Sequence, residues 1–181
     1  MKKFERGELL NRKIVYSGRI VKLVVDDIKI KGKKTLREVV HHPGGVGILA
    51  EVEHDRIPLV RQHRYPVDMD VLEIPAGKIE SGEEPERTAM RELEEETGYR
   101  PLNIIPAFSY YPTPGYCDEL LHIYYVNSVE KTGVCFDADE ELEIEFYTLD
   151  KALEMIREGE IKDGKTIAAL YWLALNRNRT Q

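Results

Sequence analysis

One segment of 23 residues, from Gly77 to Tyr99, constrains the fold of this chain more than any other stretch, and it reads GKIESGEEPERTAMRELEEETGY. Pro85 suits the first turn of a helix, because its missing N–H would have no partner there. Gly98 suits the left-handed position that ends a helix. The sequence therefore predicts a helix from about Pro85 to about Thr97.

Three glutamates share one side of this predicted helix. Glu92, Glu95 and Glu96 lie three and four positions apart, so their side chains project together, whereas Glu94 points away. Like charges at this spacing cost roughly 0.2–0.5 kcal/mol per pair. Magnesium is a candidate to neutralise them, because a hard divalent ion prefers oxygen ligands and can be shared with substrate phosphates. From the residues alone, a solvated acidic face is the other interpretation.

The whole segment resembles the box of the Nudix hydrolase family. The fixed positions of that box are matched in residue type and in spacing by Gly77, Glu83, Arg91, Glu92, Leu93, Glu95, Glu96 and Gly98. In that family the box is a loop, helix and loop that binds divalent metal and cleaves a nucleoside diphosphate linked to another group. The resemblance implies that Glu92, Glu95 and Glu96 are catalytic metal ligands and that the carbonyl of Ala76 is a further ligand.

The other box residues are expected to have structural roles, with direct participation in the chemistry as the alternative for Glu83 and Arg91. We expect Glu83 and Arg91 to form a buried ion pair that holds the loop against the helix. Leu93 should anchor the helix to the sheet. Gly77 and Gly82 suit turn conformations that residues with a Cβ avoid.

Composition and charge exclude several classes of protein. The chain has 181 residues, of which 42% are hydrophobic and 33% charged, as in a folded protein with one substantial core. Its net charge of -7 argues against nucleic-acid binding. The chain has no apolar run long enough to cross a membrane and no apolar signal core, so we expect a cytoplasmic protein. Cys117 and Cys135 lack a metal-binding spacing and are interpreted as free thiols.

The N-terminal region is rich in β-branched residues. From Lys13 to Val40 the pattern predicts a meander of about three strands, with breaks near Ser17 and at residues 31–34. Nudix enzymes that act on ADP-ribose pack a similar β region against a second copy of the chain. We therefore expect residues 1–40 to form an antiparallel β region that makes a homodimer, and residues 41–181 to form the Nudix hydrolase domain.

The remaining pattern predicts an α/β (α+β) protein with the Nudix fold, in which a mixed β-sheet is sandwiched between helices. Strands at 46–52 and 57–62 are expected to form a hairpin through the turn at 53–55. A short strand enters the box at 71–75, and further strands are expected at 103–111, 120–129 and 144–149. Asp150 should cap a helix that ends before Gly159, and a buried helix should run from about Lys165 to Arg177.

Four residues are expected to bind the substrate. Arg64 closes a strand, and its guanidinium fork matches phosphate oxygens, although a surface salt bridge is the alternative. Arg37 falls where similar enzymes place an arginine that contacts the substrate. Thr113 and Glu119 match positions in a loop that contacts the terminal ribose in those enzymes. Pro114 lies 16 residues after Gly98, the spacing that marks the ADP-ribose pyrophosphatase branch of the family.

An acidic loop follows at residues 137–143. Similar enzymes carry there a carboxylate that binds metal or activates water. Glu140 is our choice for this catalytic and metal-binding role, with Asp139 and Glu141 close behind. The alternative is an acidic loop that only faces solvent.

The resemblance implies metal-dependent hydrolysis of ADP-ribose, with Mg²⁺ as the cofactor and Mn²⁺ or Zn²⁺ as possible substitutes. The products would be AMP and ribose 5-phosphate. Another nucleoside diphosphate sugar is the first alternative substrate. A module that binds ADP-ribose without cleaving it is a second alternative, but such modules usually lose box carboxylates. The third alternative is an acidic helix that contacts a protein partner.

Overall fold

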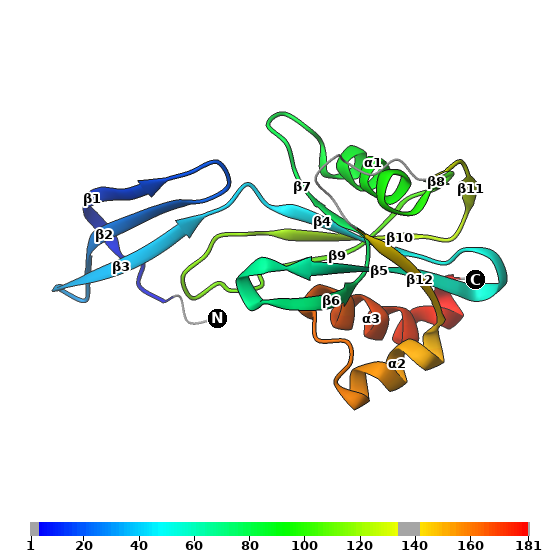
Figure 1. Cartoon of the computed structure of the whole chain (residues 1–181). Helices are drawn as coiled ribbons and strands as arrows, with labels where there is room; N and C mark the ends of the chain where they lie inside the picture. The colour runs from blue at the N-terminus through cyan, green and yellow to red at the C-terminus, as the bar shows by residue number, and fades with distance from the viewer. Residues whose placement is uncertain (1–3, 134–141, 181) are drawn as a thin grey trace. The chain divides into compact units, whose positions relative to one another are not determined.

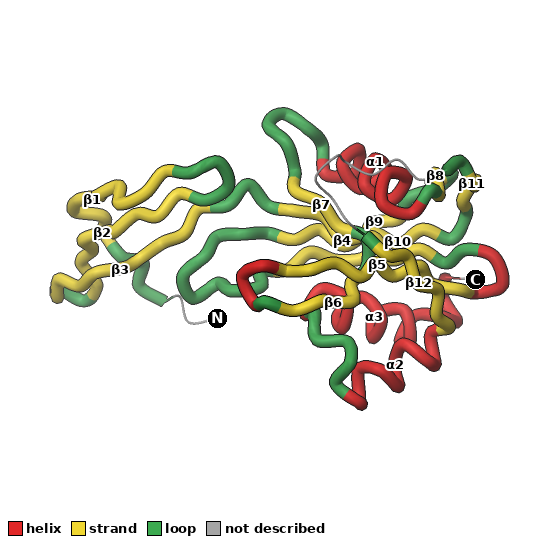
Figure 2. Tube along the Cα trace, viewed as in Figure 1, coloured by secondary structure: helices red, strands yellow, loops and turns green. Residues whose placement is uncertain are grey.

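The computed structural model describes residues 4–133 and 142–180, without the side chains of residues 54 and 178–180 (Figures 1 and 2). The chain divides into two compact units. The first unit contains Met1–Gly44 and Tyr111–Leu120, and the second contains Gly45–Tyr110 and Leu121–Gln181.

The first unit is an antiparallel sheet with a loop attached to it. Its strands are β1 (Glu8–Ser17), β2 (Lys22–Ile30) and β3 (Lys33–His41), in the order β1-β2-β3. The predicted meander is therefore confirmed. The loop at 111–120 joins the sheet through Val40, whose N–H donates to the carbonyl of Tyr116 at 2.8 Å.

The second unit contains two larger sheets and one small pair of strands. The strands are β4 (Gly45–Ala50), β5 (Arg56–Arg64), β6 (Met69–Glu73), β7 (Ala76–Lys78), β8 (Tyr99–Pro101), β9 (Ile105–Tyr110), β10 (Leu121–Val126), β11 (Val129–Lys131) and β12 (Glu143–Thr148). The first sheet has the order β7-β4-β10-β9, and β4 and β10 are parallel. The second sheet has the order β12-β5-β6, and β8 pairs with β11. Two short 3₁₀ turns lie at Glu53–Asp55 and Tyr65–Val67.

Helices cover both faces of the mixed sheet, as Figure 1 shows. They are α1 (Pro85–Thr97) on one face, and α2 (Leu149–Glu158) and α3 (Gly164–Thr180) on the other. The alternation of side chains along β4 explains this arrangement. Val46 and Ile48 pack with Leu93 of α1, whereas Leu49 packs with Leu170 of α3. The predicted mixed sheet between helices is confirmed.

Three predictions about local structure are wrong. The helix expected to be buried, α3, is buried along one side only: Leu170 and Leu173 are fully buried, whereas Tyr171 and Leu175 are 44% and 82% exposed. Strands β4 and β5 do not form a hairpin, because β4 pairs with β7 and β10 while β5 pairs with β6 and β12. At the turn between β4 and β5, the structure has one isolated antiparallel bridge, between Val52 and Arg56. Asp150 does not cap α2: the side chain of Thr148 accepts the N–H of Lys151 at 3.3 Å, so Thr148 is the cap.

Candidate active site

Helix α1 forms where the sequence predicts it, and its apolar side fixes the direction of its glutamates. Ala89 and Leu93 are fully buried against β4 and β10. Gly98 ends the helix with φ of 72°, and its N–H donates to the carbonyl of Glu94 at 2.8 Å. The predicted anchoring role of Leu93 is confirmed. Because this side of α1 is buried, Glu92 and Glu96 face the backbone of Ala76 and Gly77.

Glu92 lies directly against the backbone of Gly77, the first residue of the box. A Cβ built on Gly77 would stand 2.0 Å from the Oε1 atom and from the carboxyl carbon of Glu92. The φ angle of Gly77 is not positive, so the position is closed to a side chain by this approach and not by a left-handed turn. In contrast, Gly82 has φ of 83°, which agrees with its predicted turn role.

Glu96 reaches the same stretch of backbone from the next turn of α1. Its Oε2 atom accepts the N–H of Ala76 at 3.1 Å, and the residue is only 3% exposed. Two box carboxylates therefore lie against Ala76 and Gly77, the short segment that also carries the predicted carbonyl ligand. This contact joins β7 to α1 across 20 residues of sequence.

Arg91 holds the remaining carboxylates together. Its Nη1 lies 2.9 Å from Glu92 and 2.8 Å from Glu95, and its Nε lies 3.3 Å from Glu83. Burial would lower the pKa of Arg91, but the hydrogen bond to Glu83 and the charges of Glu92 and Glu95 outweigh burial and raise it. The hydrogen bond from Arg91 likewise lowers the pKa of Glu83. The predicted ion pair is present, but it is half-buried and not buried, with side chains that are 34% and 21% exposed. Arg91 also offsets part of the repulsion within the glutamate trio.

The donor set of these residues fits a hard divalent cation. Carboxylate and carbonyl oxygens are the ligands that magnesium prefers. Within residues 4–133 and 142–180, no three acidic, histidine or cysteine side chains already converge as a metal-binding group. The position of Glu92 against a residue without a Cβ, and of Glu96 against Ala76, brings two donors to one backbone segment.

A second charge cluster lies beside this segment, and the sequence did not reveal its partners. Arg64 donates from Nε and Nη2 to the two oxygens of Glu73, at 2.7 and 2.8 Å. Glu73 is 2% exposed and also forms an ion pair with Lys165. Burial would raise the pKa of Glu73, but the hydrogen bond from Arg64 and the charge of Lys165 lower it. Glu73 lacked an assigned partner in the sequence because Lys165 lies 92 positions away.

The charge of Glu96 on the box helix also affects the pKa of Arg64. The hydrogen bond to Glu73 raises the pKa of Arg64, and the charges of Glu96 and Asp163 add to this effect. The two hydrogen bonds to Glu73 use the N–H of Nε and one N–H of Nη2. Within the part of the chain that the structure describes, the other N–H groups of this guanidinium have no acceptor, so they can bind a further one. An anchored fork of this kind is suited to phosphate oxygens.

The other predicted substrate residues belong to the first unit. Arg37 lies on β3, and its Nη1 donates to the carbonyl of Leu36 at 2.8 Å. The carbonyl of Thr113 accepts the N–H of Cys117 at 3.0 Å in a turn. Glu119 lies 3.4 Å from the Nδ1 atom of His42. Glu140, Asp139 and Glu141 lie outside the described residues.

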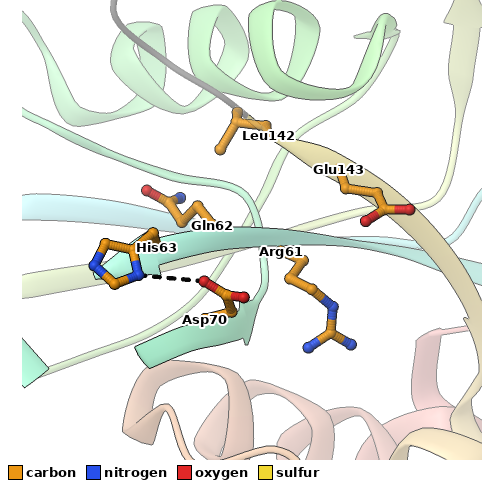
Figure 3. Close-up of a pocket in the computed structure, with 6 residues that line it drawn as sticks. All are labelled: Arg61, Gln62, His63, Asp70, Leu142 and Glu143. Atoms are coloured by element: carbon orange, nitrogen blue, oxygen red, sulfur yellow. Dashed lines mark hydrogen bonds and ion pairs between the residues drawn. The ribbon is translucent and has the colours of Figure 1, made fainter. Parts of the chain in front are cut away.

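A shallow pocket of about 370 Å³ lies between β5, β6 and the start of β12. It is lined by Arg61, Gln62, His63, Asp70, Leu142 and Glu143. Figure 3 shows His63 and Asp70 pointing toward each other from neighbouring strands. The Nδ1 atom of His63 lies 3.3 Å from the Oδ1 atom of Asp70. Arg61 is engaged with Glu145 at 2.5 Å. The pocket therefore carries charges of both signs, and most of them already have partners.

Comparison with known proteins gives the context of these features. The NUDIX domain profile matches residues 41–170. The chain is 42% identical to the methanol dehydrogenase activator of Bacillus methanolicus over 89% of each chain, and 40% identical to the ADP-ribose pyrophosphatase of Bacillus subtilis (strain 168) over 97% of this chain and 96% of that protein. The crystal structure of an ADP compounds hydrolase covers 99% of this chain and 98% of its own, with a TM-score of 0.86 and 19% identity, which supports the fold.

The helices that the structure describes can be tested as membrane-spanning segments by their length and apolar character. None of them combines the length and the apolar character that a membrane crossing requires.

Proposed function

The chain belongs to the NUDIX family of hydrolases, and we propose that it hydrolyses the pyrophosphate bond of ADP-ribose to AMP and ribose 5-phosphate. The observation that carries this proposal is the complete box, in which Glu92 and Glu96 both lie against the Ala76–Gly77 backbone. The likeness to the ADP-ribose pyrophosphatase of Bacillus subtilis over nearly the whole chain supports the choice of substrate.

We propose Glu92, Glu95, Glu96 and the carbonyl of Ala76 as ligands of a divalent metal, with Mg²⁺ preferred and Mn²⁺ or Zn²⁺ as substitutes. A bound divalent ion offsets the negative charge that develops on phosphate oxygens and lowers the pKa of a bound water. Arg91 prepares the site by holding Glu92 and Glu95 near each other despite their like charge. Glu140 is proposed to orient or deprotonate the attacking water, as the resemblance implies.

Arg64 is proposed to bind the diphosphate of the substrate. Its guanidinium is held by the buried carboxylate of Glu73, so little side-chain freedom is lost when a phosphate binds. An arginine side chain stays cationic throughout the physiological pH range, so this guanidinium can always bind phosphate oxygens. Arg37, Thr113 and Glu119 are proposed as further substrate contacts, on the resemblance alone.

We also propose that the first strands form a homodimer and that the protein works in the cytoplasm. Strand β1 is exposed along its whole length. Its large apolar side chains are between 42% and 57% exposed: Leu9, Leu10, Ile14, Val15 and Tyr16. A three-stranded sheet needs an apolar surface to pack against, and a second copy of the same sheet supplies one. In this proposal residues 1–40 serve dimerisation and residues 41–181 serve hydrolysis.

A panel of substrates tests the proposed reaction. ADP-ribose and a set of other nucleoside diphosphate sugars are incubated with the protein and Mg²⁺, and the products are separated by chromatography. We expect ADP-ribose to have the highest kcat/KM and to yield AMP and ribose 5-phosphate, and we expect excess EDTA to abolish turnover. A clear preference for another sugar nucleotide would replace the proposed substrate while keeping the metal site. Binding of ADP-ribose without turnover would instead indicate a non-catalytic module.

A further inference from the structure

The start of α3 is tied to the box through polar contacts that come from a distant part of the sequence. Asp163 accepts hydrogen bonds from the N–H and the hydroxyl of Thr166, at 2.9 and 2.6 Å. This arrangement caps the helix. Lys165 lies 3.1 Å from Asp163 and also pairs with Glu73, and its side chain is only 11% exposed.

Thr166 connects the capped helix to the strand that leads into the box. The residue is fully buried, and its hydroxyl oxygen accepts the backbone N–H of Ile74 at 2.8 Å. The same hydroxyl donates a hydrogen bond to the carboxylate of Asp163, so it is a hydrogen-bond donor and a hydrogen-bond acceptor at the same time. A buried N–H that lost this acceptor would be left unsatisfied, so Thr166 fixes the position of Ile74.

The backbone from Glu73 to Gly77 therefore has two sets of contacts. On one side, Glu73 and Ile74 are held by Lys165 and Thr166 of α3. At its other end, the N–H of Ala76 donates to Glu96, and Gly77 lies against Glu92. Pro75 stiffens the connection between the two ends, because its φ angle is fixed. We therefore expect a displacement of Ile74 to move the backbone against which Glu92 and Glu96 lie.

We propose that Thr166 and Lys165 are positioning residues of the hydrolase site. Thr166 sets the position of the Ala76 carbonyl and of the Glu96 contact. Lys165 shares the Glu73 carboxylate with Arg64 and thereby fixes the orientation of that guanidinium. The inference rests on the proposed function, since it assigns these two residues to the same metal and diphosphate site.

Substitution of Thr166 by valine removes the hydroxyl and keeps the shape of the side chain. Mn²⁺ binding is measured by electron paramagnetic resonance, and hydrolysis of ADP-ribose is measured at varied Mg²⁺. We expect Thr166→Val to weaken Mn²⁺ binding and to raise the half-saturating Mg²⁺ concentration by about 10–100-fold, the range for partners that orient metal ligands. Thr166→Ser should restore both values because it returns the hydroxyl.

Two further variants separate positioning from general loss of stability. Leu173→Ala opens the fully buried core beneath α3 but keeps the hydroxyl of Thr166 and its hydrogen bonds to Ile74 and Asp163, and we expect it to lower the melting temperature while Mn²⁺ binding stays unchanged. Lys165→Met should raise KM for ADP-ribose by about tenfold with a smaller change in kcat, and Lys165→Arg should recover most of that loss.

The inference fails if Thr166→Val binds Mn²⁺ as the wild type does, or if Leu173→Ala weakens Mn²⁺ binding equally. It also fails for Lys165 if the methionine variant keeps the wild-type KM. These outcomes differ from a failure of the proposed function, in which the wild-type protein itself neither binds Mn²⁺ nor hydrolyses a nucleoside diphosphate sugar. That last result would overturn both.

Discussion

The carboxylate of Glu92 occupies the space where a side chain on Gly77 would begin, with Oε1 2.0 Å from an ideal Cβ position. The box glycine is therefore required by a neighbour on the helix, and not by its own backbone angles. Any residue with a Cβ at position 77 must displace Glu92. This contact links the first residue of the box to one of its proposed metal ligands.

Gly77→Ala tests this relationship. We expect hydrolysis to fall by about 10–100-fold, because Glu92 must rotate away from its position at the site. The free energy of unfolding should fall by only about 1–3 kcal/mol, since the clash involves the end of a flexible side chain. Gly164→Ala is the matched control, because among the described residues no heavy atom outside its two chain neighbours and the nearby backbone of its own helix lies within 4 Å of its Cβ position. Full activity of Gly77→Ala would show that the site does not need Glu92 where it lies.

Glu96→Gln tests the role of charge in the box. An amide oxygen can still accept the N–H of Ala76, so the fold should persist while the negative charge is lost. We expect kcat/KM with Mg²⁺ to fall by about 100-fold or more, because a metal ion supplies several kcal/mol of transition-state stabilisation. Glu94→Gln removes a charge from the same helix, where Glu94 pairs with Arg100 at 2.8 Å, and should leave kcat/KM unchanged. Equal effects of the two variants would argue against a metal site at Glu96.

The buried carboxylate of Glu73 should make stability depend on pH. Its pKa is lowered from the ordinary value of 4.5 through Arg64 and Lys165, so its stabilising contribution is present above pH 4.5 and is lost as the pH falls through the folded-state pKa. We expect Glu73→Gln to cost about 1–3 kcal/mol at neutral pH, the cost of leaving charged partners unsatisfied. Urea titrations at several pH values should show this difference shrinking below pH 4.5. A difference that does not change with pH would contradict the proposed ionisation.

Ile14→Lys tests the proposed dimer. The side chain of Ile14 is 57% exposed on β1, and a charge placed in an apolar interface would not be solvated. Sedimentation velocity should give about twice the chain mass of 20.9 kDa for the wild type and the mass of a single chain for the variant. Leu175→Lys makes a similar change at a residue of α3 that is 82% exposed, and it should leave the dimer intact. A wild type that sediments as one chain would remove this part of the proposal.

Local rules predicted the box helix well. Pro85 and Gly98 set its two ends. Of the four residues that helical spacing places on the apolar side, Ala89, Leu93 and Thr97 are buried, whereas Met90 is 39% exposed. These features depend on residues that are close in sequence, where helix geometry alone determines the neighbours. The same spacing separated Glu94, which pairs with Arg100, from the other glutamates.

Predictions that needed distant partners were wrong or incomplete. The expected hairpin between residues 46–52 and 57–62 does not form, because each strand has better partners elsewhere: β10 for β4 and β12 for β5. Strand pairing is decided by the packing of the whole sheet, and a short turn between two strands does not determine it. The partner of Glu73 was missing for the same reason, since Lys165 belongs to the last helix.

The sequence by itself determined the family, the box helix and the identity of the acidic side chains, because these follow from residue types at fixed short spacings. Only the tertiary structure decided that Arg91 offsets the charge of Glu92 and Glu95, and that Lys165 and Thr166 hold the strand that enters the box. The physical reason is that hydrogen bonds and ion pairs depend on distances in space, and chain folding sets those distances for residues far apart in sequence.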